Sequence, residues 1–154
     1  MVVAEKLVLV VRHAKAGDPR AQNDRERKLT APGRAQAQKL PDLLATFPVS
    51  AVRSSPFRRC METVEPLAAA RGLRVEADPA LAEGRSLEEI LALLWSAEDG
   101  TVLCSHGDVI GNLVDELVEL GLVGGADARS EKGSTWLLRI SGALIRDARY
   151  LPAP

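Results

Sequence analysis

Two histidines stand at points of the chain where predicted strands end. Arg12 and His13 directly follow the apolar run 6–11, and His106 follows the apolar run 101–105. Runs of this kind are typical of strands that are buried on both faces of a parallel sheet. Ligands of open α/β sheets bind at the carboxyl ends of the strands, and burying charged groups without a function is costly. The pattern therefore predicts a site in which a fixed positive charge lies beside a titratable nucleophile.

A third cation, Arg59, is expected in the first turns of a helix that follows a short strand. The start of such a helix is a natural anion site, because its free amides point outward. Arg58 has Glu62 four residues later, which is the spacing of a surface ion pair. Arg59 has Thr63 at the same spacing, so we expect Arg59 to face the site. The alternative is that both arginines are simply solvated.

Length and charge limit the class of protein. The 154 residues and the mixed composition predict one globular domain, 1–154, with a substantial core. A formal net charge of -1 argues against a general nucleic-acid binder. The apolar run near the N-terminus is too short to span a membrane or to form a signal-peptide core. Cys60 and Cys104 lie in apolar surroundings, which predicts reduced core thiols and a cytoplasmic location.

Strands and helices are expected to alternate along the chain. The predicted strands cover 6–11, 49–53, 73–77 and 101–105, with 73–77 as a possible edge strand, and a terminal hairpin covers 135–140 and 143–150. The first predicted helix follows the cap Thr30 and is expected to kink or break at Pro41, and the second begins at Ser55. Two further helices are predicted over 87–95 and 109–120. This alternation predicts a three-layer α/β/α sandwich around a mostly parallel central sheet.

Four short motifs, in this order, resemble the histidine phosphatase superfamily, which includes the phosphoglycerate mutases. The motifs are Val11-Arg12-His13-Ala14, Leu29-Thr30-Ala31-Pro32-Gly33, the stretch from Ser54-Ser55-Pro56 through Arg59 to Thr63, and Ser105-His106-Gly107. The compact length is similar to SixA-type phosphohistidine phosphatases. Three segments also look like the phosphatase domains that some bacteria fuse to nudix hydrolases: 12–17, 60–67 and 132–136. Ala14 departs from the family pattern, in which glycine is usual.

The resemblance implies a phosphoglycerate mutase-like fold and a role for each candidate residue. His13 would be the nucleophile that becomes a phosphohistidine, while Arg12 and Arg59 would bind the phosphoryl oxygens. His106 would donate a hydrogen bond to a further oxygen. Glu83 stands where many relatives carry the carboxylate that protonates the leaving group, although it can equally be an ordinary loop residue. This scheme requires no metal and no other cofactor.

The sequence therefore predicts a metal-independent phosphatase, of the SixA type that acts on phosphohistidine proteins. Two alternatives stay open: a small-molecule or nucleotide phosphatase of the same superfamily, and a non-catalytic module that binds a phosphorylated ligand. The expected partner is a phosphorylated substrate, with neither nucleic acid nor a membrane involved. The charged loop 18–28 is expected to form one wall of the cleft.

Overall fold

The computed structural model describes residues 4–20 and 23–154, and within them six strands form one sheet in the order β3-β2-β4-β1-β5-β6. The strands are β1 (Lys6–Arg12), β2 (Ala51–Ser54), β3 (Val75–Ala77), β4 (Thr101–Ser105), β5 (Thr135–Ser141) and β6 (Leu144–Leu151). Strands β1 to β4 are parallel, whereas β5 pairs antiparallel with β1 and forms a hairpin with β6. The mostly parallel sheet is therefore confirmed, with β3 at one edge.

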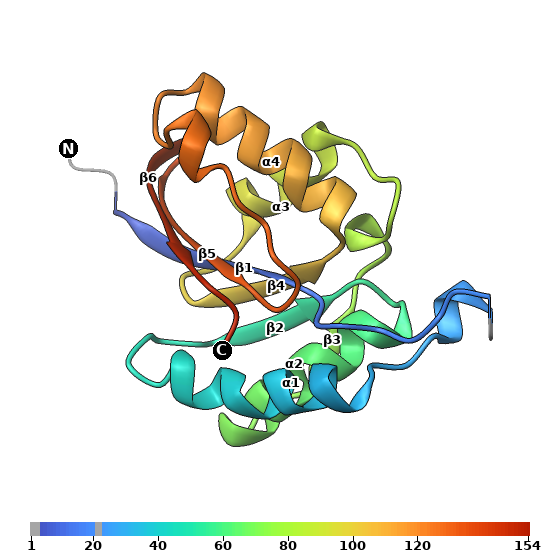
Figure 1. Cartoon of the computed structure of the whole chain (residues 1–154). Coiled ribbons are helices and arrows are strands. Elements are labelled where there is room, and N and C mark those ends of the chain that lie inside the picture. The colour runs from blue at the N-terminus through green and yellow to red at the C-terminus, as the bar shows by residue number, and fades with distance from the viewer. Residues whose placement is uncertain (1–3, 21–22) are drawn as a thin grey trace.

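Helices cover both faces of this sheet (Figure 1). One face carries α1 (Ala31–Leu43) and α2 (Arg58–Ala70), and the other carries α3 (Leu87–Ser96) and α4 (Gly107–Glu119). Short 3-10 turns occur at η1 (Asp24–Glu26), η2 (Pro79–Leu81) and η3 (Gly125–Asp127). The arrangement confirms the predicted three-layer α/β/α sandwich.

The apolar run of β1 explains its central place. Val8 and Val10 belong to the core cluster on the side of α3 and α4, and Leu9 and Val11 belong to the cluster on the side of α1 and α2. All four side chains are fully buried. Because successive side chains of a strand point to opposite faces, a strand covered on both sides must be apolar throughout. The residues that follow β1 are therefore held at the centre of the sheet edge.

Two predicted helices differ in their details. Thr30 caps α1 as predicted, but α1 continues through Pro41 and ends at Leu43. Pro41 lies in the last turn of α1, so the missing amide hydrogen removes one hydrogen bond near an end that frays in any case. The second helix begins at Arg58 rather than at Ser55, because Ser55 lies in a turn in which its Oγ accepts the N–H of Phe57 at 3.2 Å.

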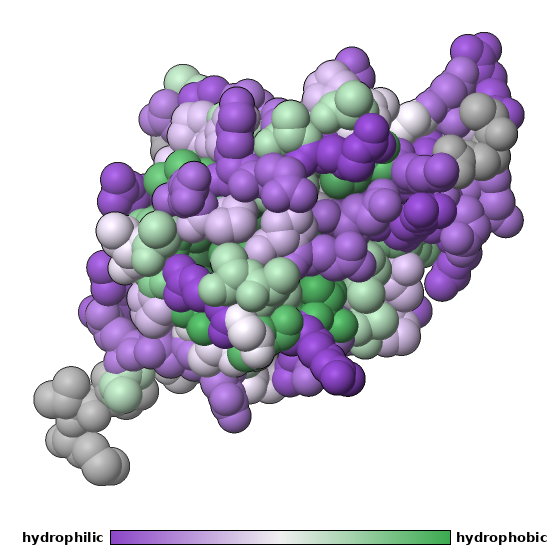
Figure 2. All heavy atoms as spheres, turned by 90° about the horizontal axis from the view of Figure 1, so that it is seen from below, coloured by the Kyte–Doolittle hydropathy of each residue, from purple (hydrophilic) through white to green (hydrophobic). Residues whose placement is uncertain are grey.

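The surface over α1 and α2 is mostly hydrophilic, with smaller apolar patches between the polar side chains (Figure 2). Cys60 and Cys104 are buried free thiols, as predicted. Across residues 4–20 and 23–154, none of the helices has the length and apolar character needed to cross a membrane.

The loop that follows β1 is anchored to the start of α1. The N–H of Thr30 donates to the Lys15 carbonyl at 2.9 Å, and the N–H of Gly17 donates to the Lys28 carbonyl at 2.9 Å. Gly33 lies so close to this loop that a Cβ there would overlap the backbone carbonyl of Lys15. The glycine therefore sets how closely α1 approaches the chain just after His13.

We expect Gly33→Ala to lower the free energy of unfolding by about 2 kcal/mol, because the added methyl group forces backbone segments apart. Gly111 is the matched control, since it is also helical and a Cβ there has no atom within 4 Å. Gly111→Ala should be neutral or should stabilise the protein by up to about 1 kcal/mol. Urea unfolding of both variants measures the difference, and equal effects would contradict the close approach at Gly33.

Candidate active site

The candidate site lies where β1 and β4 end side by side. The two strands are parallel, with Arg12 paired to Ser105, and the N–H of His13 donates to the carbonyl of Ser105 at 3.1 Å. This pairing brings the rings of His13 and His106 to 5.6 Å between their centroids. Strand β2 is the other neighbour of β4, and α2, which follows it, supplies Arg59.

His13 is 6% exposed, and its Nδ1 lies 2.7 Å from the carbonyl oxygen of Ala14. Since a carbonyl can only accept, Nδ1 carries the ring proton and Nε2 keeps its lone pair. Burial, with the positive charges of Arg59 and Arg12 and the nearby His106, lowers the pKa of His13 from 6.5 to about 3, against the opposing effect of the carbonyl. His13 is therefore neutral at physiological pH, as a nitrogen nucleophile must be.

Ala14 ties the end of β1 to α2. Its N–H donates to Oγ1 of Thr63 at 2.9 Å, and the same hydroxyl donates to the carbonyl of Arg59 at 2.7 Å. Ala14 is fully buried beside Leu29 and Ala37, and its φ is not positive. The backbone here does not require glycine, which explains how alanine can occupy this position.

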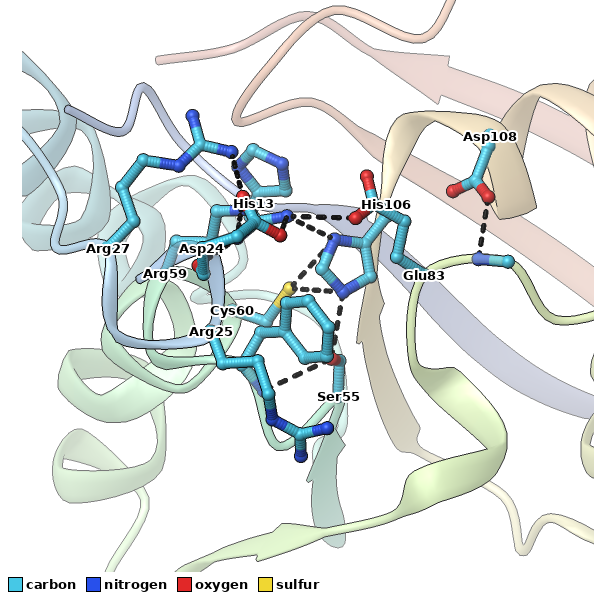
Figure 3. Close-up of polar contacts among 12 residues, drawn as sticks. His13, Asp24, Arg25, Arg27, Ser55, Arg59, Cys60, Glu83, His106 and Asp108 are labelled. Atoms are coloured by element: carbon cyan, nitrogen blue, oxygen red, sulfur yellow. Dashed lines mark hydrogen bonds and ion pairs between the residues drawn. The ribbon is translucent and has the colours of Figure 1, made fainter. Parts of the chain in front are cut away.

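Arg59 is 1% exposed and reaches between three other segments of the chain (Figure 3). Its Nη1 donates to the backbone carbonyl of Asp24 at 2.8 Å and lies 3.4 Å from the carboxylate of Asp24. Its Nη2 lies 3.5 Å from Oε2 of Glu83 and 3.3 Å from Nδ1 of His106. Arg58 instead points outward and pairs with Glu62 at 3.4 Å, so the two arginines take the orientations expected from their spacing.

Arg12 reaches the site from the side of α4. Its Nη1 donates to the carbonyl of Ser130 at 2.6 Å, and its guanidinium lies against Gly107, where a Cβ would be 2.7 Å from Nη2. The Nε atoms of Arg12 and Arg59 are buried, and no described residue accepts a hydrogen bond from them. Because leaving a buried donor unpaired is costly, both guanidinium groups are suited to bind an anion.

His106 is 1% exposed and forms the N-cap of α4. Its Nε2 lies 2.8 Å from Oγ of Ser55 and 3.5 Å from Sγ of Cys60, and the ring of Phe57 packs edge-on at 4.8 Å. The Ser55 hydroxyl thus lies at Nε2, whereas Nδ1 is the nitrogen that faces Arg59.

Glu83 follows η2 and lies at the rim of the site, with its side chain 49% exposed. Among the five predicted site residues it is the exposed one, while the two histidines and Arg59 are buried. The next residue, Gly84, donates its N–H to Oδ2 of Asp108 at 2.7 Å, which ties this loop to the first turn of α4. The structure thus places Glu83 beside the other predicted residues.

Two residues at the site were not singled out by the sequence. Asp24 belongs to the predicted wall 18–28, but its contact with Arg59 spans 35 residues and follows no local spacing rule. Ser55 directly follows β2, at the same sheet edge as the two histidines, and that position is the signal that could have identified it.

The arrangement can support nucleophilic attack on an anionic group. An unprotonated nitrogen of His13 lies near guanidinium groups with unpaired donors and near a second imidazole. No group of three or more histidine, cysteine, aspartate or glutamate side chains within the described ranges is arranged to hold a metal ion.

Comparisons with known proteins agree with this geometry. The model of the histidine phosphatase superfamily (branch 1) matches residues 8–92. The 8-oxo-(d)GTP phosphatase of Mycolicibacterium smegmatis is 32% identical over 160 residues, which cover 99% of this chain and 50% of the relative. This chain therefore spans half the length of that relative.

Solved structures share the fold. The putative phosphohistidine phosphatase SixA from Agrobacterium tumefaciens matches with a TM-score of 0.79 at 21% identity, covering 96% of this chain and 97% of the other. The protein histidine phosphatase SixA complexed with tungstate matches with a TM-score of 0.73 at 21% identity, covering 94% of both chains. A phosphoglycerate mutase from Plasmodium falciparum matches with a TM-score of 0.63 at 21% identity, covering 93% of this chain and 89% of the other, which confirms the predicted fold.

We expect His13 to control part of the acid sensitivity of the protein. Its pKa is about 3 when folded and near 6.5 when unfolded, so the unfolded chain binds more protons between these values. The stability that neutral His13 contributes is present above pH 6.5 and is lost as the pH falls toward 3. At pH 4.5 the loss is about 3 kcal/mol.

The variant His13→Gln lacks this titration, so its free energy of unfolding should fall less than that of the wild type between pH 7 and pH 4.5. Urea unfolding at both pH values measures the two differences. Other titrating groups are common to both proteins and cancel in the comparison. Parallel pH profiles would contradict a buried, neutral His13.

Proposed function

The chain belongs to the histidine phosphatase superfamily, branch 1, and from this membership we propose that it hydrolyses phosphorylated substrates through a covalent phosphohistidine on His13. The observation that carries the proposal is the hydrogen bond from Nδ1 of His13 to the carbonyl of Ala14, at 2.7 Å. This bond leaves the lone pair on Nε2, next to the buried cation Arg59.

In the first step, Nε2 of His13 attacks phosphorus in line, and the phosphorus–nitrogen bond forms as the bond to the leaving group breaks. Arg12 and Arg59 bind the non-bridging oxygens through charge-assisted hydrogen bonds. His106 donates to a further oxygen from Nδ1. Losing one such preorganised donor typically lowers the rate by about 10²–10³-fold.

In the second step, water attacks the phosphohistidine, the phosphorus–nitrogen bond breaks, and inorganic phosphate leaves neutral His13 ready for another cycle. The leaving group of the first step needs a proton when it is an alkoxide. Glu83 is proposed to supply it from its protonated form, because its carboxyl group lies at the rim of the site near Arg59. In the second step the Glu83 carboxylate takes a proton from the attacking water, which restores the acid. No metal takes part in either step of this proposal.

The proposed substrate is a phosphohistidine of another protein. Its imidazole is a good leaving group, so the first step depends little on an acid, and the half-exposed Glu83 marks an open side that a protein surface can reach. A nucleotide is the second candidate substrate, and the 32% identity to an 8-oxo-(d)GTP phosphatase over nearly the whole chain favours it.

The test compares the wild type with His13→Ala, both treated with a chelator, on p-nitrophenyl phosphate, a phosphohistidine-bearing protein and 8-oxo-dGTP. We expect the wild type to release phosphate through an acid-labile phosphoenzyme, and kcat in the variant to fall by at least about 10⁴-fold. The highest kcat/KM should be found for the phosphohistidine protein.

Each other result has a defined meaning. The highest kcat/KM for 8-oxo-dGTP would favour the nucleotide candidate. Activity retained in His13→Ala would contradict the proposed nucleophile. Phosphate binding without turnover of any substrate would favour the non-catalytic binding module.

Replacing Glu83 by glutamine tests its role as the proton donor. Glu83→Gln should lower kcat/KM by about 10²-fold for alkyl phosphates, whose leaving groups need a proton, and much less for p-nitrophenyl phosphate. Glu88→Gln is the matched control, because Glu88 is an exposed carboxylate of the neighbouring α3. Equal slowing of both substrates by Glu83→Gln would rule out proton donation by Glu83.

A further inference from the structure

The proposed mechanism requires His106 to donate a hydrogen bond from Nδ1, the ring nitrogen that lies 3.3 Å from Arg59. A neutral imidazole carries a single proton, and the hydrogen bond made by one nitrogen decides whether the other is protonated. The partner of the other nitrogen, Nε2, is the hydroxyl of Ser55 at 2.8 Å (Figure 3). Ser55 therefore touches the atom that controls the proton of His106.

The surroundings of Ser55 favour donation by its hydroxyl. Ser55 is fully buried, and its Oγ accepts the N–H of Phe57 at 3.2 Å. Within the described residues, Nε2 of His106 is the acceptor that this hydroxyl reaches. When Ser55 donates to Nε2, the hydroxyl and Nε2 are both satisfied, and the ring proton lies on Nδ1, where it needs an acceptor other than Arg59.

On the basis of the function proposed above, we propose that Ser55 is a positioning residue that keeps the proton of His106 on Nδ1, where it can bind the phosphoryl group. Without a substrate, Arg59 faces the same nitrogen and favours the opposite tautomer, because a guanidinium can only donate. The Ser55 hydroxyl can accept a hydrogen bond from Nε2–H in that tautomer, and it can donate to Nε2 in the tautomer with the proton on Nδ1. Once Arg59 donates to a phosphoryl oxygen instead, Nδ1–H of His106 donates to a neighbouring phosphoryl oxygen. The Ser55 hydroxyl then donates to Nε2.

Other groups near His106 do not provide this control. Sγ of Cys60 lies 3.5 Å from Nε2 and 4.0 Å from Nδ1, so it faces both ring nitrogens and does not select one of them. Among the described residues, the charged and titratable groups around the ring and its partner Arg59 are Cys60 of α2, His13 after β1, Arg12 of β1, Asp24 of η1 and Glu83 after η2. None of these, apart from Cys60, contacts Nε2.

The direct test is ¹⁵N NMR of the imidazole nitrogens with inorganic phosphate bound. The chain has only two histidines, so a His106→Gln spectrum assigns the signals. We expect the His106 proton on Nδ1 in the wild type, and a substantial shift toward Nε2 in Ser55→Ala. Ser54→Ala is the matched control, because Ser54 is also fully buried but its Oγ donates to the carbonyl of Ser55.

Kinetics supply a second test that a purely structural role would not pass. Ser55→Ala should lower kcat/KM for p-nitrophenyl phosphate by about 10²-fold at neutral pH. The loss should appear mainly in kcat rather than in KM, because Ser55 acts through His106 and does not itself bind the phosphoryl oxygens. Ser54→Ala should keep the kcat and the KM of the wild type.

A proton on Nε2 in the phosphate-bound wild type would overturn the proposal, whether or not the variant folds. An unchanged tautomer in Ser55→Ala, or a loss that appears in KM while kcat is unchanged, would also overturn it. The NMR result does not depend on turnover. A wild type that binds phosphate with the expected tautomer but hydrolyses nothing would refute the proposed function and leave the role of Ser55 intact.

Discussion

The burial of one cation organises the candidate site. A guanidinium that is 1% exposed must be surrounded by acceptors, and Arg59 finds them in segments far apart in the sequence. Asp24 comes from the loop after β1, Glu83 from the loop after η2, and His106 from the end of β4. Each of these segments is itself anchored to the sheet or to a helix. The position of Arg59 therefore depends on the whole sandwich, and the loops around it depend on Arg59.

The same burial bears on how the site would take up the proposed phosphoryl group. In the free protein the carboxylates of Asp24 and Glu83 lie 3.4–3.5 Å from the guanidinium, which is longer than a strong charge-assisted hydrogen bond. The positive charge of Arg59 holds the pKa of Asp24 below its ordinary value, although burial opposes this shift. A phosphoryl group presents more oxygens with better geometry to the same cation. In the proposed mechanism, binding a phosphoryl group would therefore replace the long contacts of Arg59 with Asp24 and Glu83 by shorter ones.

The sequence predicted the parts of this protein that follow local periodicity. A short unbroken apolar run is typical of a strand covered on both faces, so the place of β1, and of the histidine that follows it, was predictable. The spacing of Arg58 and Glu62 likewise separated two adjacent arginines. The pairing of Asp24 with Arg59 and of Ser55 with His106 was not predicted, because local spacing relates only residues of one helix or strand, and these partners belong to different segments. Such contacts depend on which strands are neighbours in the sheet, and the apolar runs in the sequence do not specify that order.

The two histidines, for which we propose different roles, have different hydrogen-bond partners at the same sheet edge. Nδ1–H of His13 donates to the carbonyl of Ala14, so Nε2 keeps its lone pair. Nε2 of His106 is hydrogen-bonded to the Ser55 hydroxyl, and Nδ1 faces Arg59. A carbonyl can only accept and therefore fixes one tautomer, whereas a hydroxyl can accept or donate and allows the proton to move. A nucleophile needs the first partner, and a donor that must face first Arg59 and then a phosphoryl oxygen needs the second.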